Sequence, residues 1–299
     1  MKKLFLTCFV CFSFLAESAA TAEDRVQLAT LDSSSSPEVG AAPLWQDLDP
    51  GNLQVRSASV LVLDQSGHVI YAKQADQPRP IASITKLMTA MVILDSSLSL
   101  EEPVTITRED RDLLKLTGSR LKYGATLSRE QLVRLALMAS ENRAAHALAR
   151  TYPGGETAFV DAMNEKARSL GMHQSHFADP AGLNPGNVAS ARDVATMVRA
   201  ARAYALILDA TTTRFTSVSP YDGRGELRFG NTNRLLRNES WEIQLSKTGY
   251  ISEAGRCLAM QAAIGDQSLV IVLLNSFGKL TPYGDSNRIR RWIEHARQS

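Results

Sequence analysis

Residues 80–94 read Pro80-Ile81-Ala82-Ser83-Ile84-Thr85-Lys86-Leu87-Met88-Thr89-Ala90-Met91-Val92-Ile93-Leu94, and this stretch decides the fold. A turn former followed by an apolar run predicts a helix with Ser83 in its first turn. Lys86 comes three residues later and shares a helix face with Ser83. A serine hydroxyl becomes a nucleophile when a neighbouring base takes its proton. Burial at the start of an apolar helix lowers the pKa of a lysine, as that role requires. A helix cap followed by a surface lysine explains the same pattern, so the pair needs support from other motifs.

Composition sets broad limits on the fold and the partners. The chain has 299 residues, of which 44% are apolar and 21% charged, with a formal net charge of +2. These values are ordinary for a globular protein of one large domain or two small ones. Because no basic run stands out, the sequence gives no indication of nucleic-acid binding.

The N-terminus has the features of a secretory signal peptide. Lys2 and Lys3 precede an apolar run, and Ala20-Thr21-Ala22 fits a small-residue cleavage site. We therefore expect residues 1–22 to be removed, 23–54 to form a linker and 55–299 to form the catalytic domain. Cys257 is then the one cysteine left, and we expect it to be a small buried strand residue. The mature protein is expected to be soluble and exported.

The order of predicted elements is hairpin, helices, strands, helix. The apolar runs within 58–64 and 68–72 predict strands, which the turn Gln65-Ser66-Gly67 joins. Ser128-Arg129-Glu130-Gln131 has the form of a capping box and opens a helix. Further helices are expected at 144–148, at 156–170 and after Ser190, strands at 241–250, 256–260 and 269–274, and an amphipathic helix at 285–297.

Two later motifs support the first one. Ser140-Glu141-Asn142 follows the predicted second helix, and Lys247-Thr248-Gly249 lies in a predicted strand. The ordered set Ser83-x-x-Lys86, Ser140-x-Asn142 and Lys247-Thr248-Gly249 resembles that of penicillin-recognising serine enzymes. Residues 79–90 and 138–145 resemble the low-molecular-mass penicillin-binding proteins, and most of all their D-alanyl-D-alanine endopeptidase branch, the penicillin-binding protein 7 type. The resemblance covers residues 55–298.

The resemblance implies a fold and a set of catalytic residues. The fold would be α+β, of the β-lactamase/transpeptidase-like kind, with an antiparallel sheet flanked by helices and an α-rich subdomain. Ser83 would be the nucleophile and Lys86 the general base. Ser140 would pass a proton toward the leaving amine, with Lys247 holding the local charge.

The same resemblance implies how substrate is held. Asn142, Lys247 and Thr248 would bind polar groups of the peptide, and the backbone N–H groups of Ser83 and Tyr250 would form the oxyanion hole. Gly249 lacks a side chain, which would let substrate backbone approach the strand. The implied activity is hydrolysis of D-alanyl-meso-diaminopimelyl cross-links in the peptidoglycan of the periplasm, inhibited by β-lactams.

Alternatives remain open from the sequence. A D-alanyl-D-alanine carboxypeptidase that trims pentapeptide stems would use the same residues, and a β-lactamase or a non-catalytic wall-binding protein is less favoured. His173 and His176 have a spacing that metal sites use, but no third ligand accompanies them, so we expect neither metal nor cofactor. The expected partners are peptidoglycan peptides and β-lactams, with at most loose membrane association.

Overall fold

The computed structural model describes residues 45, 48–223 and 225–296. The predicted signal peptide and most of the predicted linker lie outside the described residues. None of the helices in the described ranges is long and apolar enough to cross a membrane.

A five-stranded antiparallel sheet forms the centre of the fold. Its order is β2-β1-β11-β10-β9. The strands are β1 (Ser59–Leu63), β2 (Val69–Lys73), β9 (Glu242–Ile251), β10 (Gly255–Ile264) and β11 (Gln267–Ser276). The predicted hairpin and the three predicted late strands are all present. β9 is an edge strand, so one of its backbone edges is left for other elements or a bound peptide.

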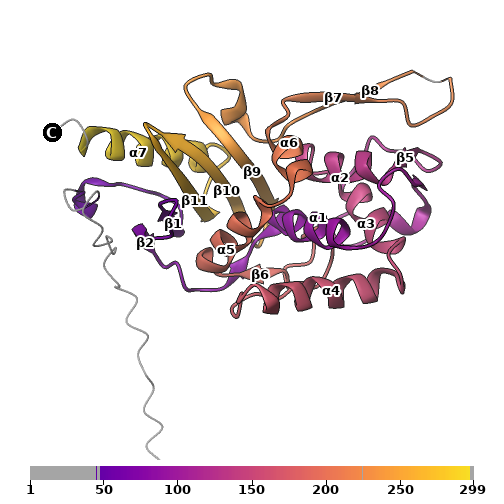
Figure 1. Cartoon of the computed structure of the whole chain (residues 1–299), viewed down its shortest axis with the longest axis horizontal. Helices are drawn as coiled ribbons and strands as arrows, with labels where there is room; N and C mark the ends of the chain where they lie inside the picture. Colours follow the sequence, from indigo (N-terminus) through magenta and orange to yellow (C-terminus); the bar gives the residue numbers. More distant parts are fainter. Residues whose placement is uncertain (1–44, 46–47, 224, 297–299) are drawn as a thin grey trace, which may run out of the picture. The chain divides into compact units, whose positions relative to one another are not determined.

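Both faces of the sheet are buried, and the pleat distributes the residues of each strand between them. In β1, Val60 and Val62 join an apolar cluster with Trp292 of α7 (Thr281–Ala296). Leu61 and Leu63 point the opposite way, into the larger cluster that includes Val194 of α5 (Ala191–Ala201). The sheet is therefore the middle layer, with α7 against one face and α5 against the other (Figure 1).

The apolar core begins earlier in the chain than the predicted domain start at residue 55. Trp45, Leu48 and Leu53 are buried in the cluster under α7. Trp45 Nε1 donates a hydrogen bond to Asp64 Oδ2, 3.1 Å away. Residues 45 and 48–54, which the sequence suggested as linker, thus contribute to the packed domain.

The other elements are helices and short pairs of strands. The helices are α1 (Lys86–Asp95), α2 (Arg129–Met138), α3 (Asn142–Arg150), α4 (Gly155–Ser169) and α6 (Ala205–Thr212). The short strand pairs are β3 (Arg79–Pro80) with β6 (Val188–Ala189), β4 (Pro103–Thr105) with β5 (Thr126–Ser128), and β7 (Phe215–Val218) with β8 (Leu227–Gly230). The predicted capping box opens α2, since the Ser128 and Gln131 side chains each bond the other's backbone N–H.

The helices α1 to α4 pack on one another as an α-rich region beyond one end of the sheet (Figure 1). A 3₁₀ turn, Ala82–Thr85, connects this region to the sheet, because it leads directly into α1 and also contacts β9. The predicted fold class, an antiparallel sheet flanked by helices with an α-rich subdomain, is confirmed. One local detail differs: Ser83 lies in the 3₁₀ turn, and Lys86 is the first residue of α1.

Candidate active site

Ser83 and Lys86 meet at the junction of the sheet and the helices. Lys86 Nζ lies 2.8 Å from Ser83 Oγ. The same nitrogen donates to Asn142 Oδ1 at 2.8 Å and to the carbonyl oxygen of Ala181 at 2.6 Å. These three oxygens fix the amine where it can exchange a proton with the serine hydroxyl.

Burial sets the protonation of this amine. Lys86 is completely buried, and burial lowers its pKa to about 7 because the charged form loses its hydration. The negative charges of Asp179, Glu141 and Asp112 act in the opposite direction and keep the pKa from falling further. A lysine with such a pKa is about half neutral near pH 7, so it is able to accept the proton of Ser83.

The second motif lies on the turn between α2 and α3. Ser140 has a φ of +58°, in the left-handed region that non-glycine residues rarely adopt. Its hydroxyl lies 3.0 Å from Lys247 Nζ on β9. Two residues later, Asn142 begins α3 and contacts Lys86. Strained backbone of this kind is concentrated at functional sites.

The third motif lies on β9. Lys247 is almost completely buried, and its pKa falls well below the ordinary value, first through burial and then through the charge of Lys86. Thr248 Oγ1 donates to Thr232 Oγ1 at 2.7 Å. The site therefore contains two lysines with lowered pKa values, Lys86 on α1 and Lys247 on β9.

The structure gives a reason for the small size of Gly249 besides the expected approach of substrate backbone. A Cβ on Gly249 would lie 2.8 Å from the carbonyl oxygen of Ile81 and 3.1 Å from the backbone nitrogen of Ser83. The absent side chain thus lets β9 pack directly on the backbone that carries the nucleophile. Ala82, between those two residues, has a φ of +48°, so this turn is also strained.

A cavity of about 600 Å³ opens over the three motifs. Its lining includes most of the residues predicted for the site: Ser83, Ser140, Asn142, Thr248, Gly249 and Tyr250. Lys86 and Lys247 are buried and have hydrogen bonds to residues of that lining, Ser83 and Ser140 respectively. The structure therefore brings together all eight residues named from the sequence.

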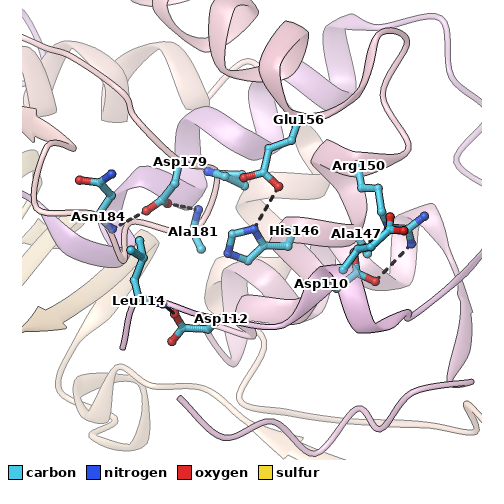
Figure 2. A network of polar contacts seen from close by, with 12 residues as sticks. Asp110, Asp112, Leu114, His146, Ala147, Arg150, Glu156, Asp179, Ala181 and Asn184 are labelled. Carbon is cyan, nitrogen blue, oxygen red and sulfur yellow. Dashed lines mark hydrogen bonds and ion pairs between the residues drawn. The ribbon is translucent and has the colours of Figure 1, made fainter. Parts of the chain in front are cut away.

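The Ala181 carbonyl comes from a loop that the sequence did not assign to the site. The Asp179 carboxylate accepts hydrogen bonds from the backbone N–H groups of Ala181, Gly182 and Asn184 (Figure 2). Asn187 donates to Asp179 O and to Thr85 Oγ1, which ties the loop to the Ser83 turn. The only sequence signal is Asp-Pro followed by Gly, a common turn composition.

A second unforeseen element lies on the opposite side of Asn142. Asn142 Nδ2 donates to Thr117 Oγ1 at 2.9 Å, and Thr117 Oγ1 donates to Asp112 Oδ2 at 2.7 Å. Asp112 also accepts from the backbone N–H group of Leu114 (Figure 2). It accepts from those of Lys115 and Thr117 as well, so it shapes the loop at 112–117. This chain of contacts holds the Asn142 amide with its oxygen toward Lys86.

The fold and the site together define a class of protein. The structure resembles that of the Streptomyces K15 DD-transpeptidase with a TM-score of 0.75 and 26% sequence identity, covering 81% of this chain and 98% of that one. With a buried Ser–Lys pair at the sheet–helix junction, the chain has the architecture of the serine D,D-peptidases.

The family follows from sequence comparison. The family model described as D-alanyl-D-alanine carboxypeptidase matches residues 46–278, and the chain belongs to this family of serine peptidases. It is 44% identical to a D-alanyl-D-alanine endopeptidase of Pseudomonas aeruginosa over 90% of this chain and 85% of the relative. It is 43% identical to a D-alanyl-D-alanine endopeptidase of Escherichia coli over 81% of this chain and 78% of the relative. The resemblance inferred from the motifs is confirmed.

Proposed function

We propose that this protein is a D-alanyl-D-alanine endopeptidase that hydrolyses D-alanyl-meso-diaminopimelyl cross-links in peptidoglycan. The observation that carries the proposal is the 2.8 Å separation of Lys86 Nζ and Ser83 Oγ at the floor of a cavity bordered by the edge strand β9. Two relatives that are 44% and 43% identical to this chain over the aligned residues are both named D-alanyl-D-alanine endopeptidase.

Acylation begins when Ser83 Oγ attacks the carbonyl carbon of the D-alanyl residue and its proton passes to Lys86. The carbonyl oxygen becomes negative in the tetrahedral intermediate, where the backbone N–H groups of Ser83 and Tyr250 are the proposed donors. Ser140, in contact with Lys247, relays the proton that Lys86 took to the leaving amine as the C–N bond breaks, so that both side chains regain their starting protonation. Asn142 and Thr248 are the proposed partners of the substrate's polar groups.

Deacylation returns the enzyme to its starting state. Water attacks the ester that joins the D-alanyl carbonyl to Ser83 Oγ, and the ester C–O bond breaks. The serine regains its proton, and the donor stem leaves with a free carboxylate. The cycle needs neither metal nor cofactor.

The cleft also suits the larger of two candidate leaving groups. A carboxypeptidase releases one D-alanine, whereas an endopeptidase releases a whole stem peptide through the amine of diaminopimelate. The cavity of about 600 Å³ also has Arg256 and Tyr283 in its lining, so it extends beyond the three motifs. This extension favours cross-links over pentapeptide ends.

Two further proposals concern the setting of the reaction. We expect export through residues 1–22 and action in the periplasm, which fractionation of cells that make the full chain would test. We also expect β-lactams to acylate Ser83. Labelled penicillin should attach to the wild-type protein and to Ser66→Ala, in which an exposed turn serine is changed, but not to Ser83→Ala. Labelling of Ser83→Ala would rule out the proposed nucleophile.

Muropeptide digestion tests the main proposal. Purified enzyme is given either a D-alanyl-diaminopimelyl cross-linked dimer or a pentapeptide monomer, and products are identified by mass. We expect conversion of dimer to monomers to be faster than release of D-alanine. Faster release of D-alanine would make the carboxypeptidase the better assignment, with the same catalytic residues.

A further inference from the structure

An ion pair connects two loops that border the active-site cavity. Lys115 Nζ, on the loop at 112–117, contacts the carboxylate of Glu253, on the turn between β9 and β10. Lys115 lines the cavity, and so does Ser252, the residue next to Glu253. The contact therefore joins two parts of the cavity rim that come from segments 138 residues apart in the chain.

The two loops belong to opposite sides of the cleft. The loop at 112–117 lies on the side of Asn142, through the hydrogen bond from Asn142 Nδ2 to Thr117 Oγ1. The turn after β9 continues the side that carries the third motif. These two sides also meet at Ser140 and Lys247, whose polar atoms are 3.0 Å apart. The ion pair is thus a second bridge between the two sides, farther along β9 than the first.

The position of the ion pair along β9 identifies the part of the substrate that it faces. In the proposed mechanism the leaving amine takes its proton beside Lys247, and the N–H group of Tyr250 points to the scissile carbonyl. Ser252 and Glu253 come after Tyr250 in the chain, on the side away from Lys247. The ion pair therefore lies toward the acyl donor, the stem that becomes attached to Ser83.

The backbone on both sides of the ion pair is held independently of it. The Asp112 carboxylate accepts a hydrogen bond from the backbone N–H group of Lys115 at 2.9 Å. Ala254, which follows Glu253, is completely buried in the larger apolar cluster. Because lysine has a flexible four-carbon side chain, its ammonium can leave the carboxylate while the loop keeps its shape. Opening of the pair would therefore leave Asn142 and the nucleophile in place.

The ion pair is exposed enough to open readily. The side chain of Lys115 is 26% exposed and that of Glu253 is 40% exposed, and pairs in such settings shift an equilibrium by up to about fivefold. The hydrogen bond from Lys115 lowers the pKa of Glu253 to about 2, so this carboxylate stays charged in the range where Lys86 titrates. Salt rather than pH is therefore the condition that weakens the pair.

We propose that the Lys115–Glu253 pair is a strap across the acyl-donor end of the cleft, which opens to admit a stem peptide that is blocked at both ends. This proposal rests on the proposed endopeptidase function. A peptide with one free end can enter beneath the strap end first. In a cross-link the donor stem is joined to a glycan strand at one end and to a second stem at the other. Such a stem enters sideways, and the ammonium and the carboxylate must separate first.

Charge reversal tests the strap without changing the catalytic groups. Lys115→Met and Glu253→Gln each remove the ion pair and keep the length of the side chain, and the glutamine keeps an oxygen for the Ser252 hydroxyl. The double variant, Lys115→Glu with Glu253→Lys, restores a pair of opposite sign. Glu165→Gln is the control, because it breaks an exposed ion pair with Arg168 on α4.

Three substrates differ in whether they need the strap to open. A small penicillin has no blocked end. A cephalosporin with a dye-capped stem peptide as its acyl side chain and a bulky substituent on its ring is blocked at both ends. Purified cross-linked peptidoglycan is the natural substrate of the second kind. The two β-lactams report entry through acylation of Ser83, so they do not depend on endopeptidase activity.

We expect the single variants to react about two- to fivefold faster than the wild type in kcat/KM with the blocked cephalosporin and with peptidoglycan. Their acylation by the small penicillin should be unchanged. The charge-reversed double variant should return to wild-type rates on all three substrates, and Glu165→Gln should match the wild type throughout. Added salt should accelerate the wild type on the blocked cephalosporin and leave the single variants unaffected, because exposed charges are screened.

Three outcomes would overturn the strap. Wild-type rates of the single variants on the blocked cephalosporin would show that the ion pair does not control entry. Slower reaction on all three substrates would show that the pair supports the shape of the cleft, and the unfolding temperatures of the variants would record this. A charge-reversed variant as fast as the single variants would show that the pairing of charges is not what limits the rate. If the wild type reacts with both β-lactams but leaves peptidoglycan cross-links intact, the endopeptidase function fails, and the cephalosporin rates still decide on the strap.

Discussion

Gly182 packs backbone to backbone against Ala82, the residue before the nucleophile. A Cβ on Gly182 would lie 2.0 Å from the carbonyl oxygen of Ala82 and 2.9 Å from the nitrogen of Ser83. Gly249 of β9 packs against the same turn, and a Cβ on Gly249 would lie 2.8 Å from the Ile81 carbonyl oxygen. Two glycines from distant parts of the sequence therefore hold the strained turn that presents Ser83.

Gly182→Ala should displace Ser83 and lower acylation by penicillin by orders of magnitude. Gly171→Ala is the matched control, because both glycines have a φ of +76° but a Cβ on Gly171 would meet nothing within 4 Å. The control should lose only the backbone strain of a left-handed alanine, roughly 1–2 kcal/mol of unfolding free energy, and keep its acylation rate. Similar acylation rates for the two variants would contradict this role of Gly182.

Lys86→Arg should lower acylation by several orders of magnitude. Arginine keeps the positive charge but does not lose its proton at workable pH, and its larger head must fit where Lys86 is fully buried. Lys166 of α4 forms an ion pair with Asp95 of α1, and the control variant Lys166→Arg should behave as wild type. An active Lys86→Arg enzyme would show that charge alone is needed at this position and would remove Lys86 from the role of base.

The pH dependence of acylation should follow the neutral form of Lys86. Because burial lowers its pKa to about 7, the rate should rise with pH through a midpoint near 7 and level off above it. Glu141→Gln removes a negative charge that stabilises the ammonium but keeps an oxygen to accept from the N–H of Arg143. The midpoint should therefore move to lower pH. A midpoint that stays in place or rises would show that Glu141 does not act on Lys86.

Cys257 should be unreactive in the folded protein although it borders the cavity. Its thiol is buried, and burial raises its pKa to about 11, so almost no thiolate exists at pH 8. We expect no modification by a thiol reagent at pH 8 and full modification after unfolding in denaturant. Rapid labelling of the native protein would show that β10 opens at Cys257. Loss of activity on labelling would show that the cysteine takes part in substrate binding.

The three motifs were predictable because each places its polar side chains by local geometry. Lys86 follows Ser83 by one helical turn, and Asn142 starts the helix that follows Ser140. Runs of apolar residues likewise predicted β1 and the late strands, because strands that are buried on both faces are apolar at successive positions. Local periodicity and capping thus account for the fold class and for the residues that meet in the cleft.

Other parts of the site depend on backbone groups or on distant pairings, and no local pattern reveals these. The acceptor for Lys86 at Ala181 is a carbonyl oxygen, which every residue possesses. The left-handed backbone of Ala82 and Ser140 falls on residue types that rarely adopt it, so the surrounding packing must impose it. The stretch that carries Trp45 was assigned to the linker, because its packing partner Trp292 on α7 comes from the other end of the chain.

Thr117 is a positioning residue that the sequence did not indicate, and its hydroxyl should control the orientation of Asn142. It accepts from Asn142 Nδ2 and donates to Asp112, which leaves Asn142 Oδ1 facing Lys86. Thr117→Val keeps the shape but loses both hydrogen bonds. Acylation should fall roughly fivefold, the effect of about 1 kcal/mol from one net hydrogen bond.

The pH profile distinguishes this role from simple loss of packing. When Asn142 is free to turn, the ammonium of Lys86 loses an acceptor, and the midpoint near pH 7 should move lower in Thr117→Val. Thr117→Ser restores the hydroxyl and should recover both the wild-type rate and the wild-type midpoint. If Thr117→Ser is as slow as Thr117→Val, the methyl group matters more than the hydroxyl, and the loop at 112–117 supports the cleft by packing alone.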